Sequence, residues 1–168
     1  MSPAAPATVA PAPAAAAPTS PTGLSPRGAL PKQLGQAAIV TTGTSSNVHV
    51  LDFTVQQITE PRCDSSSGRE APKNGRLVSL KVDAVSKDDP NNVLPAILFG
   101  AGWEFVGADG RSVEASTTAA AICHYDAPQI KPNRTYSFDV VLDVPKGQTG
   151  VLVFDPARNG GWEWALTT

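Results

Sequence analysis

The sequence predicts an all-β protein, an antiparallel β-sandwich of about seven to eight strands that follows a Pro/Ala-rich tail. Three observations lead to this prediction. Apolar and polar residues alternate with a period of two in almost every structured stretch, as they do in strands with one buried face. Gly, Pro, Asn and Asp turns separate these stretches. No window has the 3.6-residue apolar period of an amphipathic helix.

The beginning of the chain is typical of a solvated tether. Residues 1–31 contain eight of the 16 prolines, ten alanines and no acidic residue. They have too few large apolar side chains to offset the entropy that is lost on ordering. We therefore expect residues 1–33 to be disordered and residues 34–168 to form the folded domain. Deletion of residues 1 to about 32 is then expected to leave the fold intact.

The first half of the expected domain contains three alternating stretches. Residues 36–42 predict a short first strand. Residues 47–58 place Leu51, Phe53 and Val55 on one face, with His49 in phase at its edge. Residues 75–86 alternate more regularly, with apolar residues at every second position from Val78 to Ala84. Each of these stretches predicts a strand with one buried and one wet face.

The second half supplies the remaining strands. Residues 102–114 predict a hairpin that turns at Asp109-Gly110, a strong signal for a tight turn. Within residues 130–147, between turns at Pro132-Asn133 and Pro145-Lys146-Gly147, Tyr136, Phe138, Val140, Leu142 and Val144 are expected to face inward. Ser137, Asp139 and Asp143 are expected to face solvent. Residues 151–156 are apolar on both faces, as a central strand would be. Residues 162–166 close the domain with Trp162, Trp164 and Leu166 in phase.

Charge and hydropathy exclude several classes of function. The net charge is −2 and no basic stripe exists, which argues against nucleic-acid binding. No apolar run approaches the length of a membrane span. The start MSPAAP lacks the basic and apolar regions of a signal peptide. Two interpretations remain, a cytoplasmic protein or the mature region of an exported one. A Pro/Ala spacer before a single domain favours the second, a secreted or surface-tethered protein.

The two cysteines are consistent with a secreted or surface-tethered protein. Cys63 and Cys123 lie beside turn-forming residues and belong to no CxxC pair, so zinc and thioredoxin-like chemistry have no support. In an oxidising compartment the two thiols would pair, and the bridge would stabilise the domain by roughly 4 kcal/mol according to loop entropy. The alternative is two unrelated thiols. The sequence thus predicts a Cys63–Cys123 disulfide that anchors the connection over residues 60–74.

Three stretches resemble a known family. They are NGRLVSLKVDAVSKDD followed by WEFVGADGRSVE, and IKPNRTYSFDVVLDVPKGQTGVLVFDP. These strand-and-turn signatures resemble an immunoglobulin-like domain of unknown function found in secreted proteins and lipoproteins of Gram-positive bacteria. The small secreted immunoprotective antigen of mycobacteria is similar to this family. The resemblance covers about residues 34–166 and implies an exported, non-enzymatic β-sandwich with no agreed ligand or catalytic residues. Ser86 stands where many members have Asn.

Few residues could carry chemistry. In CHYD (123–126), Cys123 and His124 would point to opposite faces of a strand, which disfavours a catalytic dyad. A metal or hydrolase site would have to join His49, His124 and Asp126. A Ca²⁺ loop could be formed by Asp88, Asp89, Asn91 and Asn92. An ordinary turn without a metal favours the same residue types.

The function expected from the sequence is a non-enzymatic extracytoplasmic binding or adhesion module on a flexible tether. It would use no cofactor, be a monomer and bind an unknown protein or cell-envelope ligand through its loops. The first alternative is a carbohydrate-binding module of the cell envelope that uses exposed tryptophan, although core packing of the three indoles is favoured. The second alternative is a secreted hydrolase or metalloprotein built on the two histidines and Asp126.

Overall fold

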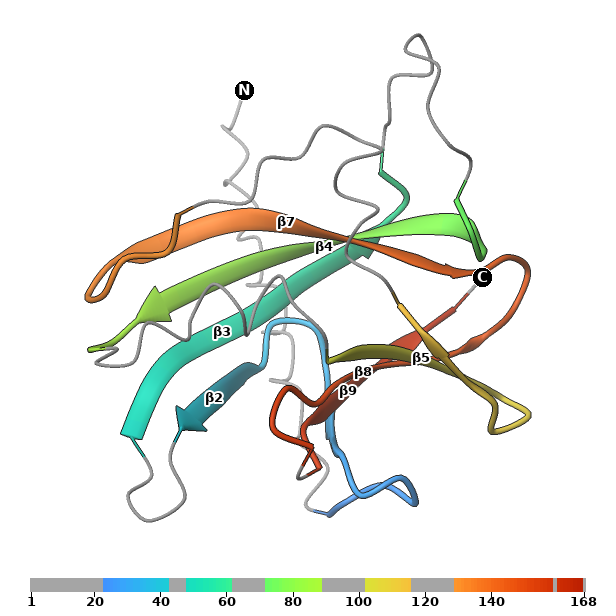
Figure 1. Cartoon of the computed structure of the whole chain (residues 1–168), viewed down its shortest axis with the longest axis horizontal. Coiled ribbons are helices and arrows are strands. Elements are labelled where there is room, and N and C mark those ends of the chain that lie inside the picture. The colour runs from blue at the N-terminus through green and yellow to red at the C-terminus, as the bar shows by residue number, and fades with distance from the viewer. Residues whose placement is uncertain are drawn as a thin grey trace, which may run out of the picture.

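The computed structural model describes residues 23–42, 48–61, 72–88, 102–115, 129–158 and 160–167. These residues form nine strands in two sheets, and no part of the described chain is helical. Figure 1 shows the two sheets as separate layers, with β2, β3, β4 and β7 in one and β5, β8 and β9 in the other. Accordingly, no described segment forms a helix that could cross a membrane.

The four-stranded sheet contains the longest strands of the molecule. Its order is β2-β3-β4-β7 and every neighbouring pair is antiparallel. The expected stretches fold as predicted, with β2 at Ala37–Thr42, β3 at Val48–Thr59, β4 at Gly75–Ser86 and β7 at Thr135–Pro145. The alternation of apolar residues therefore gave the positions of these strands correctly, and their buried faces correctly except at His49 and Asp143.

The five-stranded sheet has the order β1-β9-β8-β5-β6. It contains β1 at Leu30–Lys32, β5 at Trp103–Gly107, β6 at Ser112–Glu114, β8 at Gly150–Phe154 and β9 at Trp162–Leu166. The predicted hairpin joins β5 to β6, and Gly110 has a φ of 79° in its turn, a conformation that glycine adopts without strain. As predicted, the doubly apolar β8 is an inner strand of the sheet.

The pairing of these strands is that of an immunoglobulin-like sandwich. Strands β3, β4 and β7 pair in the order A-B-E of such domains, and β5, β8 and β9 pair in the order C-F-G. The chain crosses between the sheets from β1 to β2, from β4 to β5, from β6 to β7 and from β7 to β8. Trp103 begins β5 and is 2% exposed, which matches the buried tryptophan on strand C of immunoglobulin domains.

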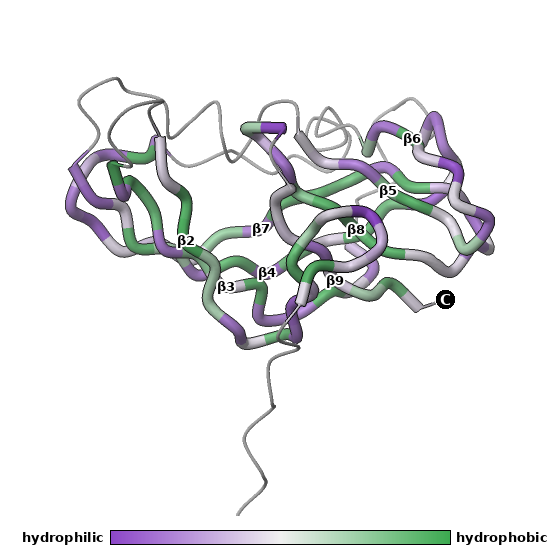
Figure 2. Tube along the Cα trace, turned by 90° about the horizontal axis from the view of Figure 1, so that it is seen from below, coloured by the Kyte–Doolittle hydropathy of each residue, from purple (hydrophilic) through white to green (hydrophobic). Residues whose placement is uncertain are grey.

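An aromatic cluster joins the two sheets at the centre of the core. Phe53 of β3 meets Phe154 of β8 edge-on, with ring centroids 5.6 Å apart. Trp103 stacks on Phe154 at 4.4 Å, and Trp162 packs edge-on against Phe53 at 5.5 Å. These are the geometries in which aromatic pairs attract one another. Figure 2 shows apolar segments in both sheets, interspersed with polar ones.

The domain begins earlier than the sequence analysis predicted. Residues 23–33 were expected to be part of a disordered tether, but they form a strap along the five-stranded sheet, defined here as residues 23–33. Strand β1 of the strap pairs in parallel with β9, and Ala29 is 1% exposed. The expected boundary after residue 33 is therefore wrong. Residues 1–22 lie outside the described chain, and their disorder stays a prediction.

Two side chains on long strands differ from their expected orientation. A β-bulge in the pairing of β2 with β3 skips Val50 and shifts the phase of the strand. His49 therefore lies at the surface, whereas Val50 and Leu51 are both buried. Asp143 was expected to face solvent but is 4% exposed. Its carboxylate accepts hydrogen bonds at 3.0 Å from the backbone N–H of Asn74, which compensates its burial.

Candidate binding groove

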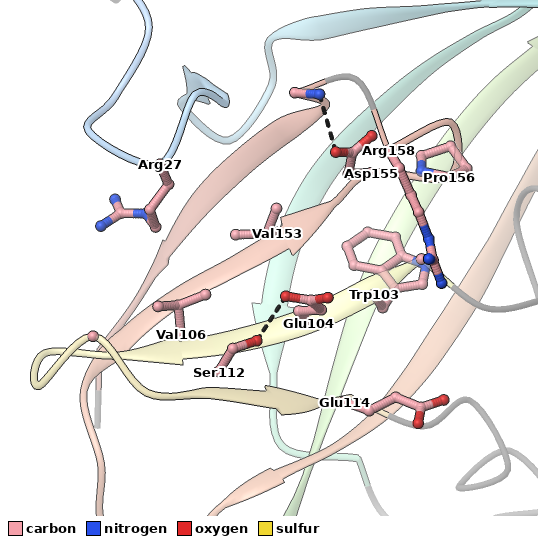
Figure 3. Close-up of a pocket in the computed structure, with 13 residues that line it drawn as sticks. Arg27, Trp103, Glu104, Val106, Ser112, Glu114, Val153, Asp155, Pro156 and Arg158 are labelled. Atoms are coloured by element: carbon pink, nitrogen blue, oxygen red, sulfur yellow. Dashed lines mark hydrogen bonds between the residues drawn. The ribbon is translucent and has the colours of Figure 1, made fainter.

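A groove of about 960 Å³ lies on the five-stranded sheet (Figure 3). Strands β5, β6 and β8 contribute the floor, with Val106 and Val153 as its apolar part. The strap borders the groove on one side through Arg27, and the β8–β9 turn borders it on another through Arg158 (Figure 3). The volume lies within the range of typical ligand sites.

Strand register sets which side chains share this face. Glu104 of β5 pairs directly with Glu114 of β6 on one side and with Val153 of β8 on the other. Val153 pairs in turn with Glu163 of β9. Residues directly opposite in an antiparallel pair point to the same face. Three glutamates therefore lie in one row across four strands, called here the glutamate row: Glu114, Glu104 and Glu163.

One member of the glutamate row is neutralised by the strap. Arg27 donates from Nε to Glu163 Oε2 and from Nη2 to Oε1, both at 2.7 Å. Ser25 Oγ adds a hydrogen bond to Oε2 at 3.0 Å. The hydrogen bond to Glu163 raises the pKa of Arg27 and outweighs the opposing effect of desolvation. This bidentate contact explains why Glu163 can lie on the outer face and still be only 5% exposed.

The other two members have no cationic partner among the residues that the structure describes. Glu104 Oε2 accepts a hydrogen bond from Ser112 Oγ at 2.6 Å, the contact drawn in Figure 3. Glu104 and Glu114 are exposed and stand directly opposite each other. Like charges in that position destabilise a sheet. The groove thus holds negative charge that the fold does not balance.

Trp103 lies beneath the groove. It is one of the residues around the hollow, but it is 2% exposed and its ring stacks on Phe154 in the core, on the face of β5 opposite to that of Glu104. Its Nε1–H is buried and has no hydrogen-bond acceptor among the described residues, a costly state for a polar group. Trp164 Nε1 shares that state, but Trp164 is not among the lining residues of the groove.

The β8–β9 turn fixes the end of the groove. Asp155 Oδ2 accepts a hydrogen bond from the backbone N–H of Gly160 at 3.0 Å, shown in Figure 3. Arg158 has a φ of 54°, a left-handed conformation that is uncommon for a residue other than glycine. Strain of this kind is often found in segments that bind ligands. The turn therefore presents an exposed arginine at the rim of the groove.

Most of the sequence-predicted site residues lie outside the described chain. This is the case for Cys63, Cys123, His124 and Asp126, and for Asp89, Asn91 and Asn92 of the proposed Ca²⁺ loop. Asp88 is described and is exposed. The Cys63–Cys123 bridge stays a prediction. Mass spectrometry under non-reducing conditions should find the chain two protons lighter than its reduced form, whereas two freely alkylated thiols would contradict the bridge.

His49 takes part in a polar cluster on the four-stranded sheet, away from the groove. Its Nε2 lies 2.7 Å from Asp52 Oδ1, and Lys87 Nζ lies 3.1 Å from Asp52 Oδ2. Burial on its own raises the pKa of Asp52, but the hydrogen bonds from Lys87 and His49, with their charges, lower it overall. In the described part of the chain, no group of three or more metal-ligating side chains converges.

The tryptophans behave as core residues, as the sequence analysis favoured. Trp103 and Trp164 are 2% and 1% exposed, and Trp162 is partly buried against the core. The two fully buried indoles present no free face to a sugar ring. A carbohydrate platform made of exposed tryptophans therefore loses two of its three expected members.

Sequence reasoning missed the groove because its parts are far apart in the chain. The glutamate row depends on the register between strands, and the strap depends on a parallel pairing between residues 30–32 and 162–164. The signal that could have pointed to it is local. Glu104, Glu114 and Glu163 each lie between residues that face the other way in alternating stretches, so each was predictably on an outer face.

Comparison with known proteins supports the fold. A secreted protein from Mycobacterium tuberculosis, MPT63, matches with a TM-score of 0.51 at 14% identity, over 82% of this chain and 98% of that one. An uncharacterised beta-sandwich protein from Clostridium difficile 630 matches with a TM-score of 0.49 at 14% identity, over 82% and 93% of the two chains. Neither a scan of protein-family models nor a search of curated proteins finds a match. The first likeness and the strand order confirm the predicted immunoglobulin-like β-sandwich.

Proposed function

We propose that this chain is a non-enzymatic binding or adhesion module that works outside the cytoplasm. The groove on the five-stranded sheet is its binding face, and the Pro/Ala-rich residues 1–22 are a tether to the cell surface. The similar mycobacterial protein is described as secreted, which agrees with this location. The resemblance to domains of Gram-positive secreted proteins and lipoproteins agrees with it too.

The observation that carries the proposal is the unbalanced charge of the groove. Glu104 and Glu114 lie opposite each other in the register of β5 and β6, and no described residue forms an ion pair with either of them. This arrangement costs stability. Features that lower stability are often retained because they serve function. The sequence analysis expected the loops at the ends of the sandwich to bind. We place the binding face instead on an outer sheet surface with an apolar floor and a charged rim.

Site-specific photo-crosslinking tests the proposal. A photoreactive amino acid replaces Val153 on the groove floor in the full chain, which is then added to cell-envelope fragments of the native host. The matched control carries the same amino acid at Val85, which is 38% exposed on the outer face of the four-stranded sheet. We expect a discrete cross-linked partner from position 153 and none from position 85. Equal labelling from both positions, or none from either, would contradict the proposal.

A further inference from the structure

We propose that the strap is a latch that tension on the tether releases, so that a pull on the tail removes one side of the groove before the sandwich itself unfolds. The inference rests on the proposed tether and the proposed binding face. Four features of the described residues lead to it: the weak attachment of the strap, the single carboxylate that holds it, the turn at which its release would stop, and the place where the tail joins it.

The strap is attached to the sandwich by few contacts. Its strand β1 has three residues, lies at the edge of the five-stranded sheet and pairs with β9 alone. The central hydrophobic cluster contains no residue of the strap. Ala29 is the one buried residue of the strap, whereas Leu24 and Leu30 are 67% and 41% exposed. Such a segment can detach at a lower cost than a strand whose side chains form the core.

One buried carboxylate holds the side chains of the strap. Glu163 accepts the two hydrogen bonds from Arg27 at 2.7 Å and the one from Ser25 Oγ at 3.0 Å. Charge-assisted bonds of this kind are strong, but all three are lost together once the strap leaves β9. Because Glu163 lies on the outer face of the sheet, water can then hydrate its carboxylate, and release leaves no unpaired buried charge. We therefore expect the strap to be released in one step.

The turn between the strap and β2 sets where the release stops. Gly35 has a φ of 81° in this turn, and its N–H donates to Val55 O at 2.9 Å. Strand β2 follows directly, and its Ala38 and Val40 belong to the central hydrophobic cluster. Detachment of β2 would therefore expose core side chains to water, which is costly. The segment that can be released at low cost is residues 23–36.

A pull on the tail reaches the strap before any other element. Residues 1–22 lead directly into Gly23, the first residue of the strap. A bound partner would hold the groove floor at Val153 of β8, and β8 pairs with β9. The load between tether and partner therefore crosses the contact between Arg27 and Glu163. Release takes Arg27 away from the side of the groove that it borders (Figure 3), which weakens the hold on the partner.

Optical-tweezers measurements on the full chain test the inference. One handle is attached to a peptide tag at the N-terminus and the other to a non-natural amino acid at position 153, so that the pull follows the path from the tether to the groove. We expect a first, short extension that precedes the main unfolding event. Its length should match the release of residues 23–36, which is at most about 50 Å of extended chain.

A matched pair of substitutions identifies the contact that yields first. Arg27→Ala removes two of the three hydrogen bonds to Glu163, so it should lower the force of the first extension. It should leave the force of the main event unchanged, because the strap is already detached at that stage. Arg111→Ala is the control, since Arg111 is 88% exposed in its pair with Asp109, and both forces should stay as in the wild type.

Hydrogen exchange of the wild-type chain in solution gives a second measurement. The N–H of Leu30 donates to Gly161 O at 3.1 Å and reports on the strap. The N–H of Val82 lies in β4, between β3 and β7, and reports on unfolding of the domain. We expect protection of the Leu30 amide to be at least tenfold lower. Low concentrations of urea should accelerate the exchange of Val82 more than that of Leu30, because release of the strap exposes little surface.

Three results would overturn the inference. They are a single unfolding event without a first extension, a first extension whose force does not change in Arg27→Ala, and equal protection of the Leu30 and Val82 amides. The proposed function fails separately. A cross-linking experiment that finds no partner at position 153 would refute the binding function, whereas the two extension events do not depend on a partner.

Discussion

Arg27 and Glu163 face each other 136 positions apart in the chain and join the N-terminal strap to the last strand by two hydrogen bonds of 2.7 Å. This contact buries a carboxylate on the outer face of the five-stranded sheet. It also fixes one wall of the groove, because Arg27 belongs to the groove lining. The stability of the domain and the shape of the groove therefore depend on the same residue pair.

The first prediction concerns this pair. Arg27→Ala leaves the buried carboxylate of Glu163 with only Ser25 as a side-chain donor. Hydrogen bonds to charged groups contribute about 1.5–3 kcal/mol, and the partial exposure of Arg27 reduces this. We expect the free energy of unfolding to fall by about 1–2 kcal/mol in urea titrations. Arg111→Ala is the matched control, since Arg111 is 88% exposed in its pair with Asp109, and its effect should be within about 0.5 kcal/mol.

The second prediction concerns the boundary between the tether and the folded domain. A chain that begins at residue 23 should melt at the temperature of the full chain, because residues 1–22 have no packable apolar pattern. A chain that begins at residue 33 loses β1, the buried Ala29 and both strap partners of Glu163. Its melting temperature should fall by roughly 5 °C or more. Calorimetry that finds equal melting temperatures for the two truncated chains would show that the strap does not stabilise the domain.

The third prediction concerns the opposed glutamates. Glu114→Gln removes one charge from a cross-strand pair of like charges and leaves the Ser112–Glu104 hydrogen bond in place. We expect the free energy of unfolding to rise by a few tenths of a kcal/mol at neutral pH and low salt. The gain should shrink at high salt because exposed charges are screened. Glu60→Gln, which breaks the pair with Arg76, should have the opposite sign, and a loss of stability in Glu114→Gln would contradict the repulsion.

The fourth prediction concerns pH. The pKa of Asp52 is lowered below its ordinary value near 3.8 by Lys87 and His49, against the opposing effect of burial. A group whose pKa is lowered on folding binds protons more readily in the unfolded chain. Its contribution to stability is therefore complete above that ordinary value and is lost as the pH falls through the lower, folded value. In urea titrations from pH 6 to pH 2, the free energy of unfolding of Asp52→Asn should fall less steeply with decreasing pH than that of the wild-type chain. Identical acid profiles for both chains would contradict the lowered pKa.

Local pattern predicted most of the fold. Period-two alternation located β2, β3, β4, β7, β8 and β9 to within about two residues. It could do so because the sequence of each strand shows by itself which of its faces is buried. The Asp109-Gly110 pair located the hairpin because its turn needs a residue that accepts positive φ. The burial of Trp103 and Trp164 followed from their phase with neighbouring apolar residues.

Features that depend on distant residues could not be predicted in this way. Strand β1 forms only because β9 offers it an edge, so nothing in residues 30–32 distinguishes it from the tail. Asp143 is buried because Asn74, 69 positions away, supplies its hydrogen bonds. The bulge at Val50 reverses the orientation of His49, and its cause lies in the pairing with β2. The glutamate row likewise exists only in the register of four strands.

The central claim, that the face holding Glu104 and Val153 is the binding face, is tested most directly by a matched pair of substitutions. Val153→Arg blocks the groove floor, and Val85→Arg places the same side chain on the opposite sheet. The measurement is the dissociation constant of the partner cross-linked from position 153, determined for both variants and the wild-type chain. We predict that Val153→Arg weakens binding at least tenfold while Val85→Arg stays within twofold of the wild type. Equal affinity of all three chains would contradict the assignment of this face.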